Sequence, residues 1–152
     1  MQSSDAPIVL VAIDCAQGDV KLLEALREAV RRTAAADERC RFACATVVPP
    51  AAALQGEGEE ATATGRHIKH LVMLRQWARP LELPEERLTY HVLESDKPAA
   101  ALVDYAAVNE VDEMLIGAPH RLASVRLFLS VAESVVRDAP CSVKVVRAPA
   151  RD

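Results

Sequence analysis

The sequence contains few aromatic residues. Phenylalanine, tryptophan and tyrosine make up 3% of the 152 residues, although hydrophobic residues make up 51%. Alanine and valine therefore carry much of the apolar content, and this mixture suits helices packed closely on a sheet. A chain of this length fits one ordinary domain, so we expect residues 1–152 to form a single domain with one core.

The sequence also lacks an excess of basic residues. Its formal net charge is -4, which provides no field attractive to nucleic acid or to an anionic membrane surface. The N-terminus, MQSSDAPIVLVAID, has no basic region and too few apolar residues for a signal peptide or a membrane span. We therefore expect a cytoplasmic protein that binds neither nucleic acid nor membrane.

The cysteines have neither the spacing of a metal finger nor the crowding of a disulfide scaffold, and there is no CxxC. We expect reduced thiols at Cys15, Cys40, Cys44 and Cys141. Cys15 alone lies at the end of an expected strand, where a redox role is the alternative to that of a small filler residue.

No enzyme signature is present in the sequence. It lacks GxxxxGK followed by Ser or Thr, HExxH, GxSxG and the Ser-Gly-Gly pyrophosphatase loop, so we expect no catalytic residue. His67 and His70 stand three positions apart on an expected helix and could share a metal. No carboxylate or cysteine pairing completes such a site, which favours surface histidines instead.

Apolar runs predict five strands, at residues 7–14, 41–48, 88–95, 111–118 and 141–148. The run at 88–95 alternates more than the others, which indicates a less covered strand. Helical periods lie between the runs, at residues 19–39, 66–81, 96–110 and 124–140. We expect Pro80 to end the second helix and Pro98 to lie in the first turn of the third.

Strands and helices therefore alternate along the whole chain. This order predicts an α/β fold with an open, doubly wound, five-stranded parallel sheet of Rossmann-like type. Ligands of such sheets bind outside the carboxyl ends of the strands, so we expect the functional site in the loops that follow Asp14, Val48 and Gly117.

Three segments together resemble the universal stress protein family. They are VAID at the end of the first strand, ESDKPAAALVDYAAVNEVDEMLIGA in the middle, and SVAESVVRDAPCSVKVVR near the end. The last segment is the most specific, since family members have a small residue, Ser-Val-x-Glu, a helix, a turn with proline and a strand rich in valine. The resemblance covers nearly the whole chain and implies a sandwich similar to adenine nucleotide alpha-hydrolases.

In the nucleotide-binding branch of that family, the strand before the last helix is followed by Gly-x-x-Gly, nine residues, then Gly and Ser or Thr. Glycines let backbone N–H groups approach phosphate oxygens, and the hydroxyl adds a donor. Gly117 matches the first glycine, but His120 and Leu129 occupy the other two positions when Ser130 is aligned with the hydroxyl residue. Pro119 removes a further N–H donor. The resemblance therefore implies weak or lost nucleotide binding.

Other residues favour a site that still binds nucleotide. The family places an acid near the nucleoside at the position of Asp14, which is alternatively a cap of the first helix or turn. Val47 and Val48 could present their backbones to an adenine. Arg121 and Arg126 either bind phosphate or are solvated surface residues. His120 either binds an anion in a pH-dependent way or is a loop residue that changed without a functional role. The candidate nucleotide-binding residues are Ala12, Asp14, Val47, Gly117, His120, Arg121, Arg126, Ser130 and Val131.

The last expected strand, CSVKVVRA, is rich in valine and would lie at or near a sheet edge. A bare apolar edge promotes aggregation, and pairing with a second copy covers it. The family resemblance implies the same arrangement, since such proteins commonly dimerise through this strand. We therefore expect a homodimer that forms through Val143, Val145 and Val146.

Together, the resemblance and the altered motif predict a non-enzymatic stress-response dimer that binds an unidentified protein partner and needs no cofactor. The alternative is a functional ATP or AMP binder with slow hydrolysis, whose phosphate site is rebuilt from Arg121, Arg126 and Ser130. A third interpretation is a regulatory domain of a larger signalling protein.

Overall fold

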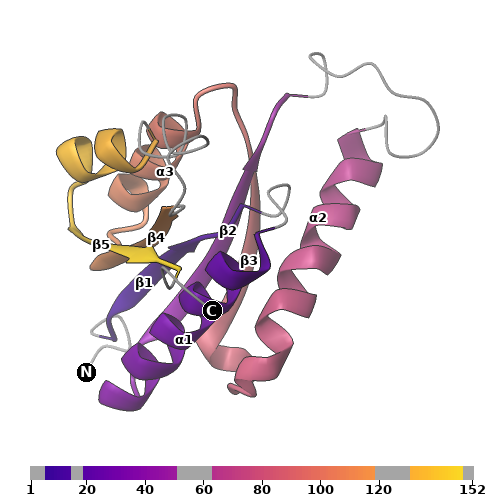
Figure 1. Cartoon of the computed structure of the whole chain (residues 1–152). Helices are drawn as coiled ribbons and strands as arrows, with labels where there is room; N and C mark the ends of the chain where they lie inside the picture. Colours follow the sequence, from indigo (N-terminus) through magenta and orange to yellow (C-terminus); the bar gives the residue numbers. More distant parts are fainter. Residues whose placement is uncertain (1–5, 15–18, 51–62, 119–130, 149–152) are drawn as a thin grey trace.

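The computed structural model describes residues 6–14, 19–50, 63–118 and 131–148 (Figure 1). The strands are β1 (Ile8–Ala12), β2 (Arg41–Val48), β3 (Leu88–Glu94), β4 (Glu113–Ala118) and β5 (Ser142–Arg147). The helices are α1 (Val20–Ala36), α2 (Ala63–Ala78) and α3 (Pro98–Val108). Residues 131–138 are also helical.

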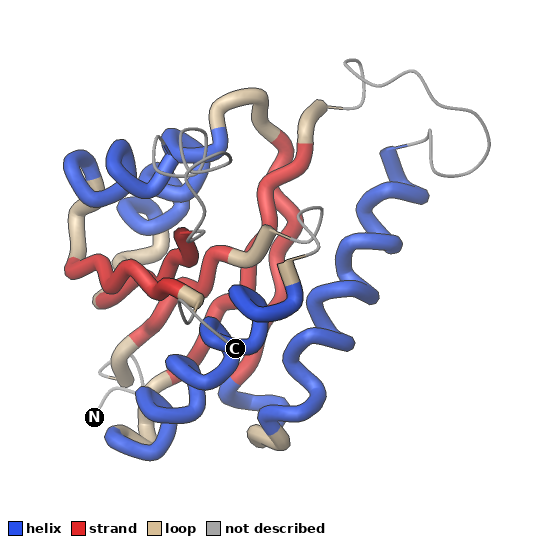
Figure 2. Tube along the Cα trace, viewed as in Figure 1, coloured by secondary structure: helices blue, strands red, loops and turns tan. Residues whose placement is uncertain are grey.

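The strands form one sheet in the order β3-β2-β1-β4-β5. Every neighbouring pair is parallel, and β1 lies at the centre between β2 and β4 (Figure 2). Val9, Leu10 and Val11 of β1 are all buried, as expected for a strand that helices cover on both faces. The predicted Rossmann-like α/β fold with five parallel strands is confirmed.

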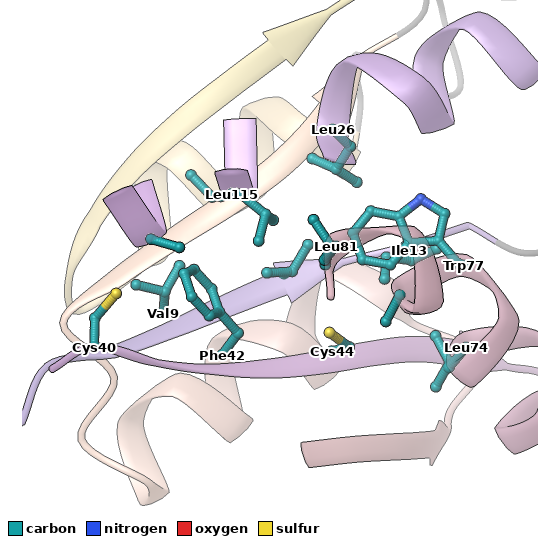
Figure 3. Close-up of a cluster of buried hydrophobic side chains, with 14 residues drawn as sticks. Val9, Ile13, Leu26, Cys40, Phe42, Cys44, Leu74, Trp77, Leu81 and Leu115 are labelled. Carbon is teal, nitrogen blue, oxygen red and sulfur yellow. The ribbon is translucent and has the colours of Figure 1, made fainter. Parts of the chain in front are cut away.

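Successive residues of β1 contribute to two different cores, one on each face of the sheet. Val9 and Val11 pack with Leu26 of α1 and Leu74 of α2 in the cluster that Figure 3 shows. Leu10 packs on the opposite face, in a cluster that includes residues of α3 and of the helical residues 131–138, namely Leu102, Ala106 and Val135. Alanine, valine and leucine dominate both cores, as the composition predicts.

α1 is amphipathic, and one of its faces is buried at Leu22, Leu26, Val30 and Ala34. The helix begins after Asp19, whose side chain accepts a hydrogen bond from the backbone N–H of Leu22 at 3.1 Å. The indole N–H of Trp77 donates to the carbonyl of Leu23 at 3.1 Å, which fixes α2 against α1. A buried tryptophan is therefore satisfied by the backbone of the neighbouring helix.

Some boundaries differ from the sequence expectation. α2 begins at Ala63 instead of residue 66 and ends at Ala78. Pro80 lies in the 3-10 turn Arg79–Leu81 that follows, where it occupies one of the first positions and its missing N–H disrupts no hydrogen bond. Pro98 begins α3, as predicted. The first residues of the expected last helix, 124–130, lie outside the described residues.

β3 and β5 form the two edges of the sheet. The residues of β3 are half-buried or exposed, which confirms the prediction of a less covered strand at this position. In β5, Val143 and Val146 are half-buried and Val145 is exposed. Within the described ranges, the structure contains no helix that is long and apolar enough to cross a membrane.

Candidate functional site

A pocket of about 160 Å³ lies at the carboxyl ends of β1, β2 and β4. The strand ends contribute Ala12, Val47 and Gly117, the first turn of α3 contributes Pro98, and the helix after β4 contributes Val131. A cavity of about 150 Å³ can hold a molecule the size of benzene. The pocket therefore has room for a single ring system.

The pocket lies where the connections of the sheet diverge. From β1 the chain passes through α1 to β2, whereas β4, on the other side of β1, is reached from β3 through α3. Because the two crossovers move apart, they leave a crevice outside the carboxyl ends of β1 and β4, where open α/β sheets bind their ligands. This is the end of the sheet at which the sequence predicts the site.

The lining of the pocket is mostly apolar, with two carboxylates. Asp14 follows β1, and Asp19 precedes α1. These are the charged side chains among the described lining residues, so this part of the wall is acidic. Acidic groups disfavour a phosphate group nearby and do not oppose a neutral ring.

The amino end of α1 also faces the pocket, since Asp19, Leu22 and Leu23 all contribute to the lining. A helix amino end often binds anions through its free N–H groups. Here the backbone N–H of Leu22 donates to the side chain of Asp19 at 3.1 Å, and that of Leu23 donates to its carbonyl at 3.0 Å. The side chain of Asp19 therefore takes one N–H group of the first turn, that of Leu22, whereas the bond from Leu23 is the first ordinary hydrogen bond of the helix.

Gly117 belongs to β4 and is the glycine that the sequence assigned to a phosphate loop. A Cβ atom at this position would lie 3.1 Å from both Cγ and Cδ1 of Leu22 and 3.2 Å from its Cδ2. These distances are shorter than ordinary carbon contacts. The close approach of α1 to β4 therefore accounts for the absence of a side chain at Gly117 without any ligand.

The structure brings together five of the predicted site residues: Ala12, Asp14, Val47, Gly117 and Val131 all line the pocket. The other four, His120, Arg121, Arg126 and Ser130, lie outside the described residues. Val48, whose backbone was also considered for adenine, is buried, and its carbonyl accepts a hydrogen bond from the N–H of Ser95 at 2.9 Å. The ligand roles of all these residues stay predictions.

Asp14 does not cap the first helix, because the N-cap of α1 is Asp19. A role of Asp14 as the cap of a turn stays a prediction, since residues 15–18 lie outside the described residues. The sequence analysis missed Asp19 as a pocket residue, although an acid directly before an apolar helical period is the usual N-cap pattern. Asp14 also makes an interaction in the structure.

A buried arginine that the sequence analysis did not single out lies at the same end of the sheet. Arg66, in the first part of α2, has 6% of its side chain exposed. Its Nη1 donates to the carbonyl of Pro49 at 3.0 Å, and its Nη2 lies 3.7 Å from a carboxylate oxygen of Glu94. Arg66 thus connects the exit of β2, the end of β3 and α2.

The remaining titratable candidates lie away from the pocket lining. Cys40 and Cys44 are buried free thiols, and burial raises the pKa of Cys44 to about 12, which makes it a poor nucleophile. Nδ1 of His70 lies 2.8 Å from the carbonyl of Arg66. In the part of the chain that the structure describes, no three His, Cys, Asp or Glu residues are grouped so that they could hold a metal ion. Cys15 lies outside the described residues.

The model of the universal stress protein family matches residues 7–147, which include every strand and the whole described pocket. The chain belongs to the universal stress protein family. The resemblance that the sequence suggested is therefore confirmed. No curated protein sequence matches the chain significantly.

Solved structures of universal stress proteins have the same fold. One, in complex with cAMP, is 19% identical with a TM-score of 0.65, and the match covers 95% of this chain and 98% of that one. The protein UspA from Lactobacillus plantarum is 23% identical with a TM-score of 0.61, covering 93% and 97%. A family protein from Arabidopsis thaliana with AMP bound is 14% identical with a TM-score of 0.58, covering 95% and 93%.

Proposed function

We propose that this universal stress protein is a non-enzymatic, cytoplasmic stress-response dimer whose pocket binds nucleotide weakly or not at all. The observation that carries the proposal is the composition of the pocket wall. Its charged residues within the described lining, Asp14 and Asp19, are both acidic, and the side chain of Asp19 takes one N–H group of the first turn of α1, that of Leu22.

The sequence after β4 supports the same conclusion. His120 and Leu129 stand where the nucleotide-binding members that the family resemblance invokes have glycine. The loss of two charge-assisted hydrogen bonds, at about 1.5 to 3 kcal/mol each, weakens binding by two orders of magnitude or more. The presence of Gly117 is not evidence for phosphate binding, because the close packing of Leu22 explains why position 117 is a glycine.

The proposed dimer forms through β5. This edge strand carries Val145, of which 37% is exposed, and the preceding helix carries Val136, of which 53% is exposed. Pairing of β5 with a second copy would satisfy the backbone groups of the edge and cover apolar surface nearby. The protein partner of such a dimer would bind elsewhere on its surface.

Analytical ultracentrifugation tests the dimer directly. We expect a dimer mass at micromolar concentration, and we expect the variant Val145→Lys to sediment as a monomer because it places charge in the interface. Val108→Lys is the matched control, since Val108 is 80% exposed at the end of α3. A monomer mass for the unmodified chain would overturn the proposed assembly.

The second candidate function is that of a true ATP or AMP binder. What favours it is the fold shared with family members whose structures contain cAMP or AMP, together with the ring-sized pocket. In that case Arg121, Arg126 and Ser130 would supply the phosphate contacts. Nucleotide titration separates the two functions.

A further inference from the structure

The helix α2 is basic and contains no acidic residue, although the whole chain has 22 aspartates and glutamates. Its Arg66 is buried and lies beside Glu94. Arg75, and Arg79 directly after the helix, are exposed instead. Positive charge is therefore concentrated on the outer side of α2, in a protein whose net charge is -4.

The two exposed arginines, Arg75 and Arg79, form no ion pair with any residue that the structure describes. This includes the three glutamates of residues 82–86, the first acids that follow the helix in the sequence. The guanidinium of Arg75 lies over the ring of Tyr90 in β3 at 4.9 Å. A guanidinium that stacks on a ring keeps its in-plane N–H groups available for a carboxylate. Both arginines therefore offer charge that the described part of the chain does not neutralise.

Two aliphatic side chains lie on the same side of α2. Ile68 is 55% exposed and Val72 is 47% exposed. Residues 68, 72, 75 and 79 are spaced by four, three and four positions, which places them in one row along a helix. We call the row of Ile68, Val72, Arg75 and Arg79 the α2 stripe. It is apolar in its first half and basic in its second half.

The α2 stripe faces away from the core. Leu74 and Trp77, on the opposite face of the helix, are buried in the cluster that includes residues of β2 and β3. The strand β5 forms the other edge of the sheet (Figure 1). A dimer that forms through β5 therefore leaves the α2 stripe accessible to a partner.

The α2 stripe complements a short helix with an acidic first turn. Carboxylates are favoured in the first turn of a helix, because they interact with its positive end. When such a helix packs antiparallel to α2, its first turn lies beside the arginines and its later turns lie beside Ile68 and Val72. Because the stripe is short and the whole protein is acidic, it suits such a segment better than an extended anionic surface such as a membrane or a nucleic acid.

We propose that the α2 stripe binds an acidic amphipathic helix of a partner protein. Two apolar residues of that helix, one turn apart, cover Ile68 and Val72. Aspartate or glutamate in its first turn accepts hydrogen bonds from Arg75 and Arg79. The inference rests on the proposed function, since it gives the chemistry of the protein partner that the dimer would bind.

A phage-displayed library of single-helix peptides, panned on the full-length protein, tests the proposal. We expect the selected peptides to carry acidic residues in the first turn and apolar residues in the next two turns. Synthetic copies of them should perturb the NMR signals of α2. Selected peptides without acidic residues, perturbations confined to other elements, or no selection at all would overturn the proposal. Binding to phosphatidylserine vesicles that requires Arg79 would also overturn it, because a lipid surface would then be the ligand.

Charge reversal tests the basic half of the α2 stripe. Arg79→Glu should weaken binding of the selected peptides by about fivefold, because it replaces an attraction with a repulsion. Arg32→Glu is the matched control, since Arg32 is 79% exposed on α1 and its reversal changes the net charge equally. A peptide with lysine in place of its acidic residues should bind Arg79→Glu more tightly than it binds the unmodified protein. Equal effects of the two reversals would contradict a specific site.

A polar substitution tests the apolar half of the stripe. Val72→Ser should weaken the selected peptides by about fivefold, because less apolar surface is buried in the complex. Val108→Ser is the matched control at an exposed valine of α3 and should leave the affinity unchanged. Since Val72 is half exposed, this variant also keeps the test valid if a charge reversal unfolds the protein. An unchanged affinity of Val72→Ser would exclude the proposed packing.

Sedimentation of the same samples keeps this proposal separate from the proposed function. Peptide binding that requires Arg79 in a monomeric protein supports the α2 stripe as the site and overturns the β5 dimer. A dimer that selects no acidic helix supports the assembly and overturns the site on α2.

Discussion

Gly117 and Leu22 are in such close contact that a methyl group on Gly117 would lie 3.1 Å from Cγ and Cδ1 of Leu22. Leu22 is buried in the first turn of α1, and Gly117 is near the end of β4. The glycine that most resembles a phosphate-binding residue in the sequence thus has a packing role. Its presence is not evidence that a nucleotide binds.

Gly117→Ala should lower the free energy of unfolding by about 1 to 3 kcal/mol, because the added methyl group overpacks the contact with Leu22. The branch point of Leu22, and not only its flexible end, is within 3.1 Å, so the side chain has little room to move. Urea unfolding measures the loss. The second substitution Leu22→Val should restore part of the stability, and a Gly117→Ala variant as stable as the unmodified protein would contradict the packing argument.

Asp19→Ala should destabilise the protein by about 1 kcal/mol, because it removes the acceptor for the N–H of Leu22. Asp19→Asn is the matched control, since asparagine caps helices as well as aspartate does. Thermal or urea unfolding of the two variants checks this. If Asn destabilises the protein as much as Ala does, the charge of Asp19 matters and capping is not its role.

Ionisation of the Cys44 thiol should lower the free energy of unfolding as the pH rises above 9. Burial raises the pKa of its thiol from 9.0 to about 12, so the unfolded chain loses this proton before the folded protein does. Between these values the free energy of unfolding should fall by about 1.4 kcal/mol per pH unit from this group. Urea unfolding at pH 8, 9 and 10 measures the slope, and Cys44→Ala should flatten it by that amount. Parallel slopes would refute the prediction.

Protonation of His91 should lower the free energy of unfolding as the pH falls below about 6.5. Burial lowers the pKa of His91, so the unfolded chain takes up the proton first and this contribution to stability is lost in acid. An NMR titration should place the pKa of His91 below that of a free histidine. Tyr105→Phe should change it little, because burial and not the hydroxyl contact is the cause. A normal or raised pKa would rule this out.

The strand positions could be predicted from the sequence because buried parallel strands are continuous apolar runs. The run Arg41–Val48 coincides with β2, and Pro98 begins α3 as its fixed backbone angle favours. The end of α2 was placed too late, because Pro80 fits the 3-10 turn that follows the helix. The pattern of apolar residues does not distinguish the last turn of an α-helix from the 3-10 turn that follows it.

The pocket could be predicted in place but not in detail. The topology alone locates it at the carboxyl ends of β1 and β4. Which acid caps α1 depends on where the loop turns, and the sequence offers both Asp14 and Asp19 nearby. The burial of Arg66 is equally hidden, since arginine is nearly always exposed and its partners lie on β2 and β3. Residues distant in sequence decide the burial of Arg66.

Calorimetric titration of the full-length protein with ATP and AMP, with and without magnesium, tests the central claim most directly. The acidic wall at Asp14 and Asp19 and the altered residues His120 and Leu129 predict no saturable binding below millimolar ligand. A dissociation constant tighter than about 10 μM, or roughly 7 kcal/mol of binding free energy, would contradict it and indicate a phosphate site rebuilt from Arg121, Arg126 and Ser130.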